Sequence, residues 1–307
     1  IEEIVLRLTK CIALEYKIKN LCLAGGVALN CVTNGKILKD KIFNKIWIQP
    51  AAGDAGGSLG AALAYWHQEL KKKRTVNLKD NMNGSYLGPK FENNVIEKEL
   101  KLLNANFKKH EEDEIINILA KELSEEKTAG WFQGRMEFGP RALGGRSILA
   151  DPRSSKMQKE LNLKVKFRES FRPFAPSILN EEVSNWFELG EASPYMLLVA
   201  NIKKEIQIPM SVEQENLFGI DKLNVKRSKI PAVTHVDYSA RIQTVHQETN
   251  PKYYKLIKRF NKLTNCPILV NTSFNIRGEP IVCSVTDAFK CFMGTNLDIL
   301  VIEDFIL

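Results

Sequence analysis

The sequence lacks the patterns that mark several large functional classes. No apolar run approaches the roughly 18 residues that a membrane span needs. The N-terminus has no basic stretch that leads into a long apolar segment and a cleavage site. A GxGxxG element, a Walker-type phosphate loop and a nucleophile elbow are also missing. These absences predict a cytoplasmic protein with no membrane partner, and they argue against covalent catalysis.

Histidine is scarce, and the cysteines show no ligand spacing. The chain has 4 His and 6 Cys, with no CxxC pair and no His spacing typical of a zinc site. The cysteines lie on apolar segments of a long chain. They are therefore interpreted as buried, reduced thiols.

Acidic residues are outnumbered by basic ones, 36 against 44, which gives a net charge of +8 over 307 residues. Residues 135–172 hold ten basic and four acidic side chains, and six of the ten are Arg. Exposed aromatics or a recognition helix, which usually accompany a nucleic-acid surface, are not evident there. Arginine's rigid fork suits phosphate or carboxylate, so the segment favours a small-anion pocket, with a solvated charged face as the alternative.

The apolar pattern predicts an α/β protein in two parts. Residues 20–70 read as two strand-loop-helix units, with strands at 21–23 and 46–48, a helix to about 38 and another from about 58. Residues 75–92 are polar and turn-forming, which indicates a linker. The second part is predicted to have strands at 128–132, 175–179, 196–202, 268–270 and 299–302, and helices at 112–123, 155–163, 250–263 and 286–292.

Two glycine-rich turns follow the first two predicted strands. Gly25, Gly26 and Asn30 lie in the first turn, while Gly53, Asp54 and Gly56 lie in the second. Paired glycines let a backbone approach a nucleotide, and a helix N-terminus offers free N–H groups. Simple turn chemistry is the alternative for the glycines. Asp54 is either a helix cap or a metal ligand.

The remaining candidate site residues lie in four polar segments of the second part. They are Arg135, Arg141 and Arg146 in a Gly-Arg block, Lys166 and Arg172 near FRPFAP, His235 and Arg241 in THVDYSAR, and Asn271, Ser273 and Arg277 in NTSFNIRGEP. Such a density of cations needs a bound anion or carboxylate partners. Glu137, Asp151 and Glu169 are the available partners, and salt-bridged scaffolding is the alternative for any single Arg. His235 by itself is typical of a structural histidine.

These segments resemble the carbamoyltransferase family of nodulation and antibiotic-tailoring enzymes. The matching stretches are LAGGVALNCVTNGKI, PAAGDAGGSLGAA, GRMEFGPRALGGRSILADPR, FRESFRPFAPSIL, THVDYSARIQTV and NTSFNIRGEPIV. The resemblance implies that residues 1–92 are the C-terminal part of an actin-like ATPase-type (ASKHA) domain. Residues 93–307 would be a YrdC-like α/β domain. The family's paired metal-binding histidines have no counterpart here, so the chain, which begins at Ile1, is expected to be a C-terminal fragment.

The resemblance also implies an activity. In the family, carbamoyl phosphate and ATP give carbamoyl adenylate, and an iron-assisted step moves the carbamoyl group to a hydroxyl of a small-molecule or sugar acceptor. Carried over by motif, the ligands of carbamoyl phosphate and ATP would be Arg141, Arg146, Lys166, Arg172, Arg241, Asn271 and Ser273. Gly25, Gly26 and Asn30 would line a nucleotide site, with Asp54 as a ligand of iron, or of magnesium bound with ATP.

Two other functions stay open at this point. One is threonylcarbamoyl transfer in tRNA modification, which would use related domains and a nucleic-acid partner. The other is a basic module that catalyses no reaction and binds nucleic acid through its net positive charge. The Arg block and the fusion of two domains favour O-carbamoyl transfer with no nucleic-acid partner. A homodimer is a further possibility.

Overall fold

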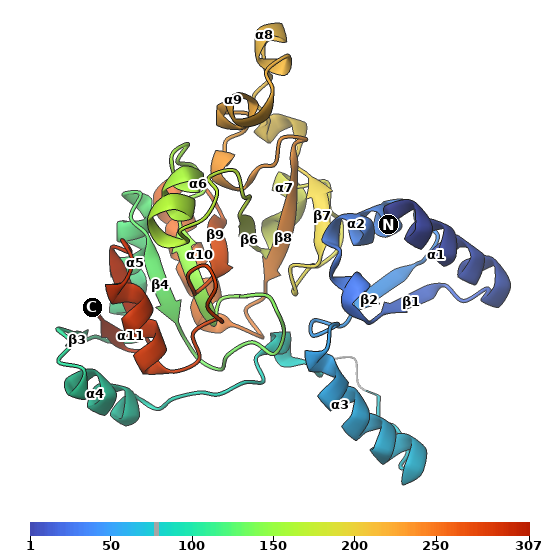
Figure 1. The fold of residues 1–307 in the computed structure, drawn as a ribbon, viewed down its shortest axis with the longest axis horizontal. Coiled ribbons are helices and arrows are strands. Elements are labelled where there is room, and N and C mark those ends of the chain that lie inside the picture. The colour runs from blue at the N-terminus through green and yellow to red at the C-terminus, as the bar shows by residue number, and fades with distance from the viewer. Residues whose placement is uncertain (77–79) are drawn as a thin grey trace.

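The computed structural model describes residues 1–76 and 80–307. The N-terminal unit contains α1 (Glu2–Tyr16), β1 (Asn20–Leu23), the 3₁₀ turn η1 (Gly26–Leu29), α2 (Cys31–Lys39), β2 (Lys45–Ile48), α3 (Ala55–Ala64) and the π-helical turn η2 (Tyr65–Glu69). Strands β1 and β2 pair in parallel, and both predicted strand-loop-helix units are present. Figure 1 shows this unit beside the main body, with α2 next to strand β7.

Within the described residues, the rest of the chain is built around a nine-stranded sheet in the order β3-β11-β10-β4-β5-β9-β6-β8-β7. Its strands are β3 (Lys108–Lys109), β4 (Ala129–Phe132), β5 (Arg146–Ala150), β6 (Ala175–Leu179), β7 (Leu198–Asn201), β8 (Ser239–Val245), β9 (Ile268–Ser273), β10 (Ile299–Ile302) and β11 (Phe305–Ile306). The sheet is mixed, because β4–β10 and β6–β8 are parallel pairs and the other pairs are antiparallel. The α/β prediction is confirmed.

Helices cover this sheet on both faces, since every residue of β4, β5, β6 and β10 is buried. The helices are α4 (Asn93–Leu102), α5 (Glu112–Ser124), α6 (Met157–Glu160), α7 (Val183–Trp186), α8 (Val212–Glu215), α9 (Gly219–Asn224), α10 (Pro251–Thr264) and α11 (Val285–Met293). Shorter turns are η3 (Asn83–Ser85), η4 (Leu161–Val165), η5 (Asn180–Glu182), η6 (Lys204–Ile206) and η7 (Pro231–Val233). Helices α5 and α10 pack together, as do α4 and α11.

Local signals explain where the long helices begin and end. Three acidic residues in the first turn of α5 complement its dipole. Asn250 caps α10 ahead of Pro251, and Asn265 ends that helix in a left-handed conformation. Ser284 and Asp287 form a capping box at the start of α11. These signals are why the predicted bounds of the three helices agree closely with those observed.

Three expectations about local structure need correction. The predicted helix at 155–163 is instead a single turn, α6, that continues as the π-helical turn η4. Strands β5 and β8 were both missed, since their segments are rich in polar residues. All six cysteines lie in the described ranges and are free, but Cys11, Cys22 and Cys283 are exposed, so the prediction of buried thiols holds fully only for Cys266 and Cys291.

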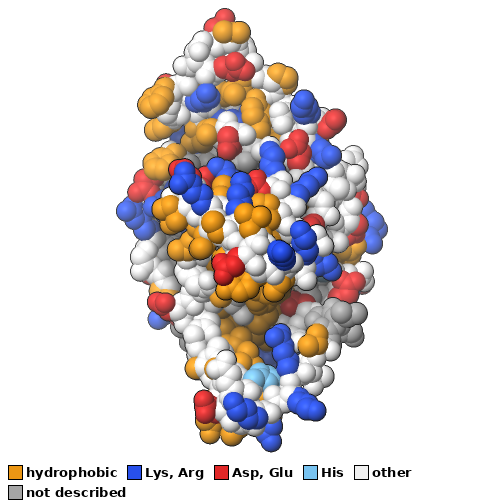
Figure 2. All heavy atoms as spheres, turned by 90° about the vertical axis from the view of Figure 1, so that its right-hand side faces the viewer, with side chains coloured by type: hydrophobic (Ala, Val, Ile, Leu, Met, Phe, Trp, Pro, Cys, Tyr) orange, Lys and Arg blue, Asp and Glu red, His pale blue; other side chains and the backbone are white. Residues whose placement is uncertain are grey.

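The N-terminal unit has little core of its own. Its two strands have no continuous buried face, and large apolar side chains such as Ile4, Leu8, Trp47 and Trp66 are exposed. Figure 2 looks onto this side of the molecule and shows apolar side chains gathered on it among Lys and Arg. The unit is held to the sheet at α2, where Asn34 Nδ2 donates to the Leu197 carbonyl at 3.1 Å. Two strands alone rarely form a stable sheet, so this contact matters for the whole unit.

Residues 80–92 of the predicted linker are tied to the main body. The Ser85 hydroxyl donates to the Phe138 carbonyl at 2.6 Å, and the Tyr86 hydroxyl donates to the Leu143 carbonyl at 2.7 Å. Residues 77–79 of the predicted linker lie outside the described residues. The domain boundary at 92 stays a prediction. Within residues 1–76 and 80–307, none of the helices combines the length and the apolar character that crossing a bilayer requires.

Candidate functional site

Two loops that are about 100 residues apart in the sequence form a cationic pocket of about 240 Å³. Residues 166–172 follow the π-helical turn η4, and residues 273–278 start at the last residue of β9. The lining residues are Lys166, Arg168, Arg172, Ser273, Asn275, Ile276, Arg277 and Gly278. We call this site the cation pocket. It contains Lys166, Arg172, Ser273 and Arg277 from the sequence-predicted set.

Lys166 is the most buried cation of the pocket, with 3% of its surface exposed. Its Nζ donates to Asn275 Oδ1 at 2.8 Å, to the Asn275 carbonyl at 3.0 Å and to Ser273 Oγ at 3.2 Å, and it also contacts the Ser273 carbonyl. Burial lowers the pKa of Lys166 to about 7, and Arg168 lowers it further in the same direction. At neutral pH this amine is therefore poised between its charged and neutral forms.

The arginines of the pocket are only partly neutralised. Arg172 Nε lies 3.1 Å from Glu169 Oε2, and Arg277 Nη1 lies 3.3 Å from Glu169 Oε1, so one carboxylate serves two guanidinium groups. Arg168 donates instead to the neutral Asn162 Oδ1 at 2.7 Å. Burial, followed by Arg172, lowers the pKa of Arg168. Four basic side chains line the pocket, and Glu169 pairs with only two of them, which leaves an excess of positive charge that a phosphate-bearing ligand would offset.

Arg141 and Arg241 form a second cationic group next to the N-terminal unit. Arg141 Nη2 donates to the Leu29 carbonyl at 3.4 Å, while its Nε is buried without a partner. Burial, followed by Arg141, lowers the pKa of Arg241 to about 10, and the Cys31 thiol opposes that shift. In the described part of the chain, neither Arg141 nor Arg241 forms an ion pair with a carboxylate.

Arg168 connects the two cationic groups. Its charge lowers the pKa of Lys166 in the cation pocket and also that of Arg241. The pocket and the Arg141–Arg241 pair therefore lie within electrostatic range of one another. A ligand with more than one phosphate fits such an arrangement better than a single small anion does.

Arg146 is a scaffold residue in this structure. It is fully buried in β5, and its guanidinium carbon lies 3.5 Å from the centroid of the Phe132 ring. Both terminal nitrogens donate to backbone carbonyls, which belong to Pro89, Gln133, Gly134 and Gly145. Burial lowers the pKa of Arg146 to about 10. Both terminal nitrogens are already occupied, so this arrangement does not support the predicted role as a direct phosphate ligand.

Asn271 is also buried, in the middle of the sheet between β5 and β6. Its Nδ2 donates to the Ala142 carbonyl at 3.1 Å, to Ser177 Oγ at 3.0 Å and to Gln243 Oε1 at 2.8 Å. Its Oδ1 has no partner. The Asn271 side chain thus ties the Gly-Arg block to the sheet core. It is not among the residues that line the cation pocket.

His235 and Arg135 lie outside the cation pocket. His235 Nδ1 is 3.0 Å from Ser239 Oγ, and burial lowers the pKa of His235 despite the opposing effect of Asp237. This arrangement is typical of a structural histidine, although Arg241 is close enough to affect its pKa. Arg135 is exposed and donates to the Gly88 carbonyl at 3.0 Å.

The glycine-rich turns of the N-terminal unit meet the Gly-Arg block. Gly25, at φ 95°, donates its N–H to the Ala52 carbonyl at 2.8 Å, which joins the two turns. A Cβ on Gly56 would lie 2.1 Å from the Ala51 carbonyl oxygen, so only glycine fits there. A Cβ on Gly139 would lie 2.9 Å from the Pro50 carbonyl oxygen, which shows how closely the block approaches. Gly26 begins η1, and Gly53 accepts from the Gly56 N–H at 3.1 Å.

Asn30 and Asp54 occupy the starts of helices. Asn30 Oδ1 accepts from the Thr33 N–H at 3.1 Å and so caps α2, which gives it a structural role. Asp54 precedes α3 and is exposed, but its side chain makes no capping hydrogen bond. Among residues 1–76 and 80–307, no three His, Cys, Asp or Glu side chains cluster in a way that could hold a metal ion. The described residues therefore form no complete metal site by themselves, and Asp54 as a metal ligand stays a prediction.

The sequence-based selection of site residues omitted four members of the pocket lining: Arg168, Asn275, Ile276 and Gly278. A signal for two of them was available. Arg168 lies between Lys166 and Arg172 in the same loop, and Asn275 follows Ser273 by two residues. Ile276 and Gly278 carry no charge or polar side chain, so nothing in the local sequence marks them.

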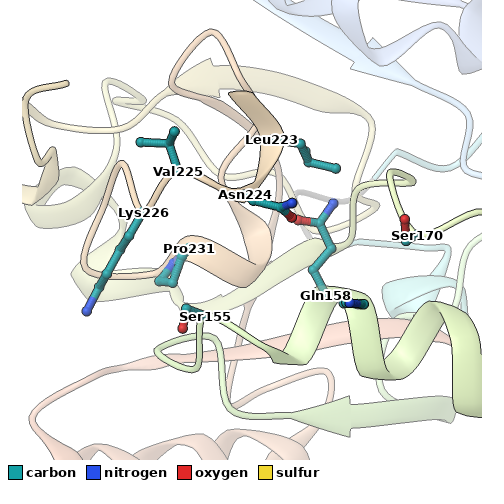
Figure 3. A pocket seen from close by; sticks show the side chains of 9 residues that line it. Ser155, Gln158, Ser170, Leu223, Asn224, Val225, Lys226 and Pro231 are labelled. Carbon is teal, nitrogen blue, oxygen red and sulfur yellow. The ribbon is translucent and has the colours of Figure 1, made fainter. Parts of the chain in front are cut away.

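A second, smaller pocket of about 30 Å³ lies between α6 and the end of α9. Figure 3 shows Gln158 and Ser155 facing Asn224, Lys226 and Pro231 across it, with Ser170 at one side. This volume suits one or two water molecules and no larger ligand. The cation pocket is therefore the better candidate for a ligand site.

Comparison with known proteins gives consistent matches. A family model described as Carbamoyltransferase C-terminus matches residues 120–307, and one described as Carbamoyltransferase N-terminus matches residues 1–63. The uncharacterized protein sll1178 of Synechocystis sp. is 58% identical over 308 residues, which cover 100% of this chain and 50% of that protein. Nodulation protein NolO of Bradyrhizobium diazoefficiens is 43% identical over 291 residues, which cover 94% of this chain and 49% of NolO.

The chain spans about half the length of these curated relatives. Similarity to solved structures is weaker. A variant of Sua5 from P. abyssi aligns with 15% identity and a TM-score of 0.39, over 64% of this chain and 50% of that one. A score at that level supports no argument about fold or activity.

Proposed function

Because this chain belongs to the carbamoyltransferase family, we propose that it binds carbamoyl phosphate and ATP and forms carbamoyl adenylate for O-carbamoyl transfer. The observation that carries the proposal is the cation pocket, in which four basic side chains gather around one carboxylate, Glu169, that pairs only with Arg172 and Arg277. Two substrates that both bear phosphate match that excess of positive charge. In this proposal, residues 93–307 form the adenylating domain, of YrdC-like type, and residues 1–92 belong to an actin-like domain.

The balanced reaction consumes carbamoyl phosphate, ATP and water, and it releases carbamoyl adenylate, pyrophosphate and phosphate. Water attacks the carbamoyl carbon, and the bond from that carbon to the phosphate oxygen breaks, which gives carbamate and phosphate. A carbamate oxygen then bonds to the α-phosphorus of ATP as the bond from that phosphorus to the bridging β-phosphate oxygen breaks and pyrophosphate leaves. Arg172 and Arg277 hold phosphate oxygens once these displace Glu169. Lys166, fixed by Ser273 and Asn275, places a positive charge where the leaving group develops negative charge.

The transfer step is proposed to deliver the carbamoyl group to a hydroxyl of a small molecule or sugar. Since the described residues form no complete metal site by themselves, we derive no metal-dependent step from this chain. Arg141 and Arg241 adjoin Leu29 and Cys31 of the N-terminal unit. This position suits them to hold an adenylate between the two parts of the chain.

Incubation of the chain with carbamoyl phosphate and α-labelled ATP tests the proposal. We expect labelled carbamoyl adenylate and pyrophosphate, and loss of both products in Lys166→Met and Arg172→Ala. Lys164→Ala is the matched control, because that lysine is exposed, two residues before Lys166 and ion-paired with Glu160. Failure of the wild-type chain to bind either substrate would overturn the proposal. Salt-sensitive RNA binding without nucleotide binding would favour a nucleic-acid-binding module instead.

A further inference from the structure

The cation pocket recognises phosphate but offers little to a nucleobase. Among the described residues that line it, Ile276 is the only apolar side chain. A nucleotide that places its phosphates on Lys166 and Arg172 therefore needs a separate surface for its base, within a few ångströms of the pocket. On the basis of the proposed function, we propose that Phe167 and Phe171 form that surface and stack on the adenine of ATP.

The exposure of these two rings is unusual for this protein. The chain has 15 phenylalanines, all in the described ranges, and just three of them are exposed: Phe167, Phe171 and Phe218. Phe167 is 48% exposed and Phe171 is 55% exposed, although burial of such a ring would stabilise the fold. Two of the three exposed rings thus fall within one seven-residue loop of the cation pocket, which corrects the sequence-based expectation that residues 135–172 show no exposed aromatics.

The position of the rings in that loop favours a ligand. Phe167 lies between Lys166 and Arg168, and Phe171 immediately precedes Arg172, so each ring is adjacent in sequence to a cation that lines the pocket. Successive residues are about 3.8 Å apart at Cα, so the backbones of Phe167 and Phe171 lie beside those of the lining cations, with both rings outside the pocket lining itself. An aromatic ring stacks on any base, and neighbouring guanidinium groups add to the attraction.

The backbone holds Phe167 in a conformation that bulky residues rarely adopt. Its φ is 48°, in the left-handed region. The flanking residues are fixed, since the Lys166 N–H donates to the Leu161 carbonyl at 2.8 Å and the Arg168 N–H donates to the Asn162 carbonyl at 2.9 Å. This strain follows directly after the π-helical turn η4. Strained backbones and π-turns are concentrated at functional sites, which supports a ligand role for this exposed ring.

Comparison of ATP with inorganic tripolyphosphate separates base recognition from phosphate recognition. We expect calorimetry on the whole chain to show at least a roughly 5-fold loss of ATP affinity in Phe167→Ala and in Phe171→Ala, with tripolyphosphate affinity unchanged. Phe167→Tyr keeps an aromatic face and should bind ATP as the wild type does. Phe218→Ala removes a ring that is 93% exposed, on the segment that leads into α9 and outside the cation-pocket loops, and it should change neither affinity.

The outcomes separate this inference from the proposed function. If the wild type binds ATP and the alanine variants bind it equally well, the stacking role is wrong and the proposed function stands. If the variants lose ATP and tripolyphosphate to the same extent, the rings position the cations and do not bind a base, which also overturns the inference. If the wild type binds neither ligand, the proposed function itself fails.

Discussion

The Nζ atom of Lys166 lies 2.8 Å from the Oδ1 atom of Asn275, and this contact joins the two loops of the cation pocket. The loops leave different elements, η4 and β9, and the Lys166 amine also bonds to Ser273. A buried lysine amine thus has a structural role and a chemical one at the same site. Its position makes the pH dependence of the protein informative.

The first prediction concerns the pH dependence of stability. The pKa of Lys166 is about 7 in the folded chain, below its ordinary 10.5, so between these values the unfolded chain binds more protons. The free energy of unfolding should therefore rise with pH across this window, by up to about 1.4 kcal/mol per pH unit from this group. Urea unfolding of wild type and Lys166→Met at several pH values measures the slope, which should be smaller in the variant.

Lys164→Met provides the control for that measurement, because Lys164 is exposed on the same turn. Its slope should match that of the wild type. Equal slopes in wild type and Lys166→Met would show that the Lys166 amine keeps an ordinary pKa in the folded chain.

The second prediction separates scaffold from ligand at Arg146. Removal of its guanidinium takes away the donor of the Gln133 and Gly134 carbonyl oxygens, whereas those of Pro89 and Gly145 keep backbone donors, and each buried unpaired oxygen costs about 1–3 kcal/mol. We expect Arg146→Ala to lose at least about 3 kcal/mol of stability, and Arg146→Lys to recover little, since an amine cannot replace the planar fork. Chemical denaturation measures both. Arg135→Ala, at an exposed site with one backbone contact, should change stability by about 0.5 kcal/mol at most.

A contrary result at Arg146 would be equally clear. If Arg146→Ala unfolds like the wild type and loses ATP affinity alone, the family-based assignment of Arg146 as a direct ligand is right. The conformation described above would then change when ligand binds.

The third prediction concerns Glu137, which organises the Gly-Arg block. Its Oε1 accepts from the N–H groups of Leu143 at 2.6 Å and Gly145 at 2.7 Å, and it is 3.4 Å from that of Arg146. Glu137→Ala leaves these donors buried and unpaired, at about 1–3 kcal/mol each. It should also weaken tripolyphosphate binding, because Arg141 lies in the loop that Glu137 holds.

Rescue by a conservative change tests this positioning role. Glu137→Gln keeps an oxygen acceptor. It should recover more than half of the stability that Glu137→Ala loses, and it should keep most of the affinity for tripolyphosphate. Glu160→Ala, which removes an exposed ion pair, should cost about 1 kcal/mol or less. If Glu137→Gln is as damaging as Glu137→Ala, the negative charge matters and the hydrogen bonds alone do not explain the role.

The fourth prediction compares two helical glycines. A Cβ on Gly35 in α2 would lie 2.1 Å from the Val199 carbonyl oxygen in β7, whereas a Cβ on Gly60 in α3 would meet nothing within 4 Å. Gly35→Ala should push α2 from the sheet and destabilise the chain by about 1–3 kcal/mol. Gly60→Ala should stabilise α3 by about 0.5–1 kcal/mol. Thermal unfolding of the two variants should therefore shift in opposite directions. A shift in the same direction would show that α2 does not depend on close packing at β7.

Elements with strong local signals were predicted well. Helices α5, α10 and α11 follow from apolar periodicity together with their end residues. Strand β5 was missed because Arg146 and Ser147 give its segment a loop-like composition, although both are buried. Strand β8 was missed for the same reason, since Arg241 and Gln243 are polar residues inside the sheet. Burial of a polar residue depends on distant partners, which local patterning does not contain.

The candidate site shows the same division. The segments around Lys166 and Ser273 were singled out from the sequence and both line the cation pocket, because charge density and polar side chains at the end of a strand are local features. The sequence could not predict that Arg146 would be enclosed by backbone carbonyls while Arg172 lines the pocket, because both are arginines in basic segments. The carbonyls that occupy Arg146 come from Pro89 and Gln133 as well as from its own neighbour, Gly145.

The sequence by itself determined that this is an α/β protein of the carbamoyltransferase family with a concentration of cations between residues 135 and 172. Only the tertiary structure decided which of those cations are available to a ligand. At the pocket, Arg172 and Arg277 share the one carboxylate of Glu169, whereas Arg146 is enclosed by backbone carbonyls. The physical reason is that a charge needs either solvent or partners, and the partners come from segments far away in the chain.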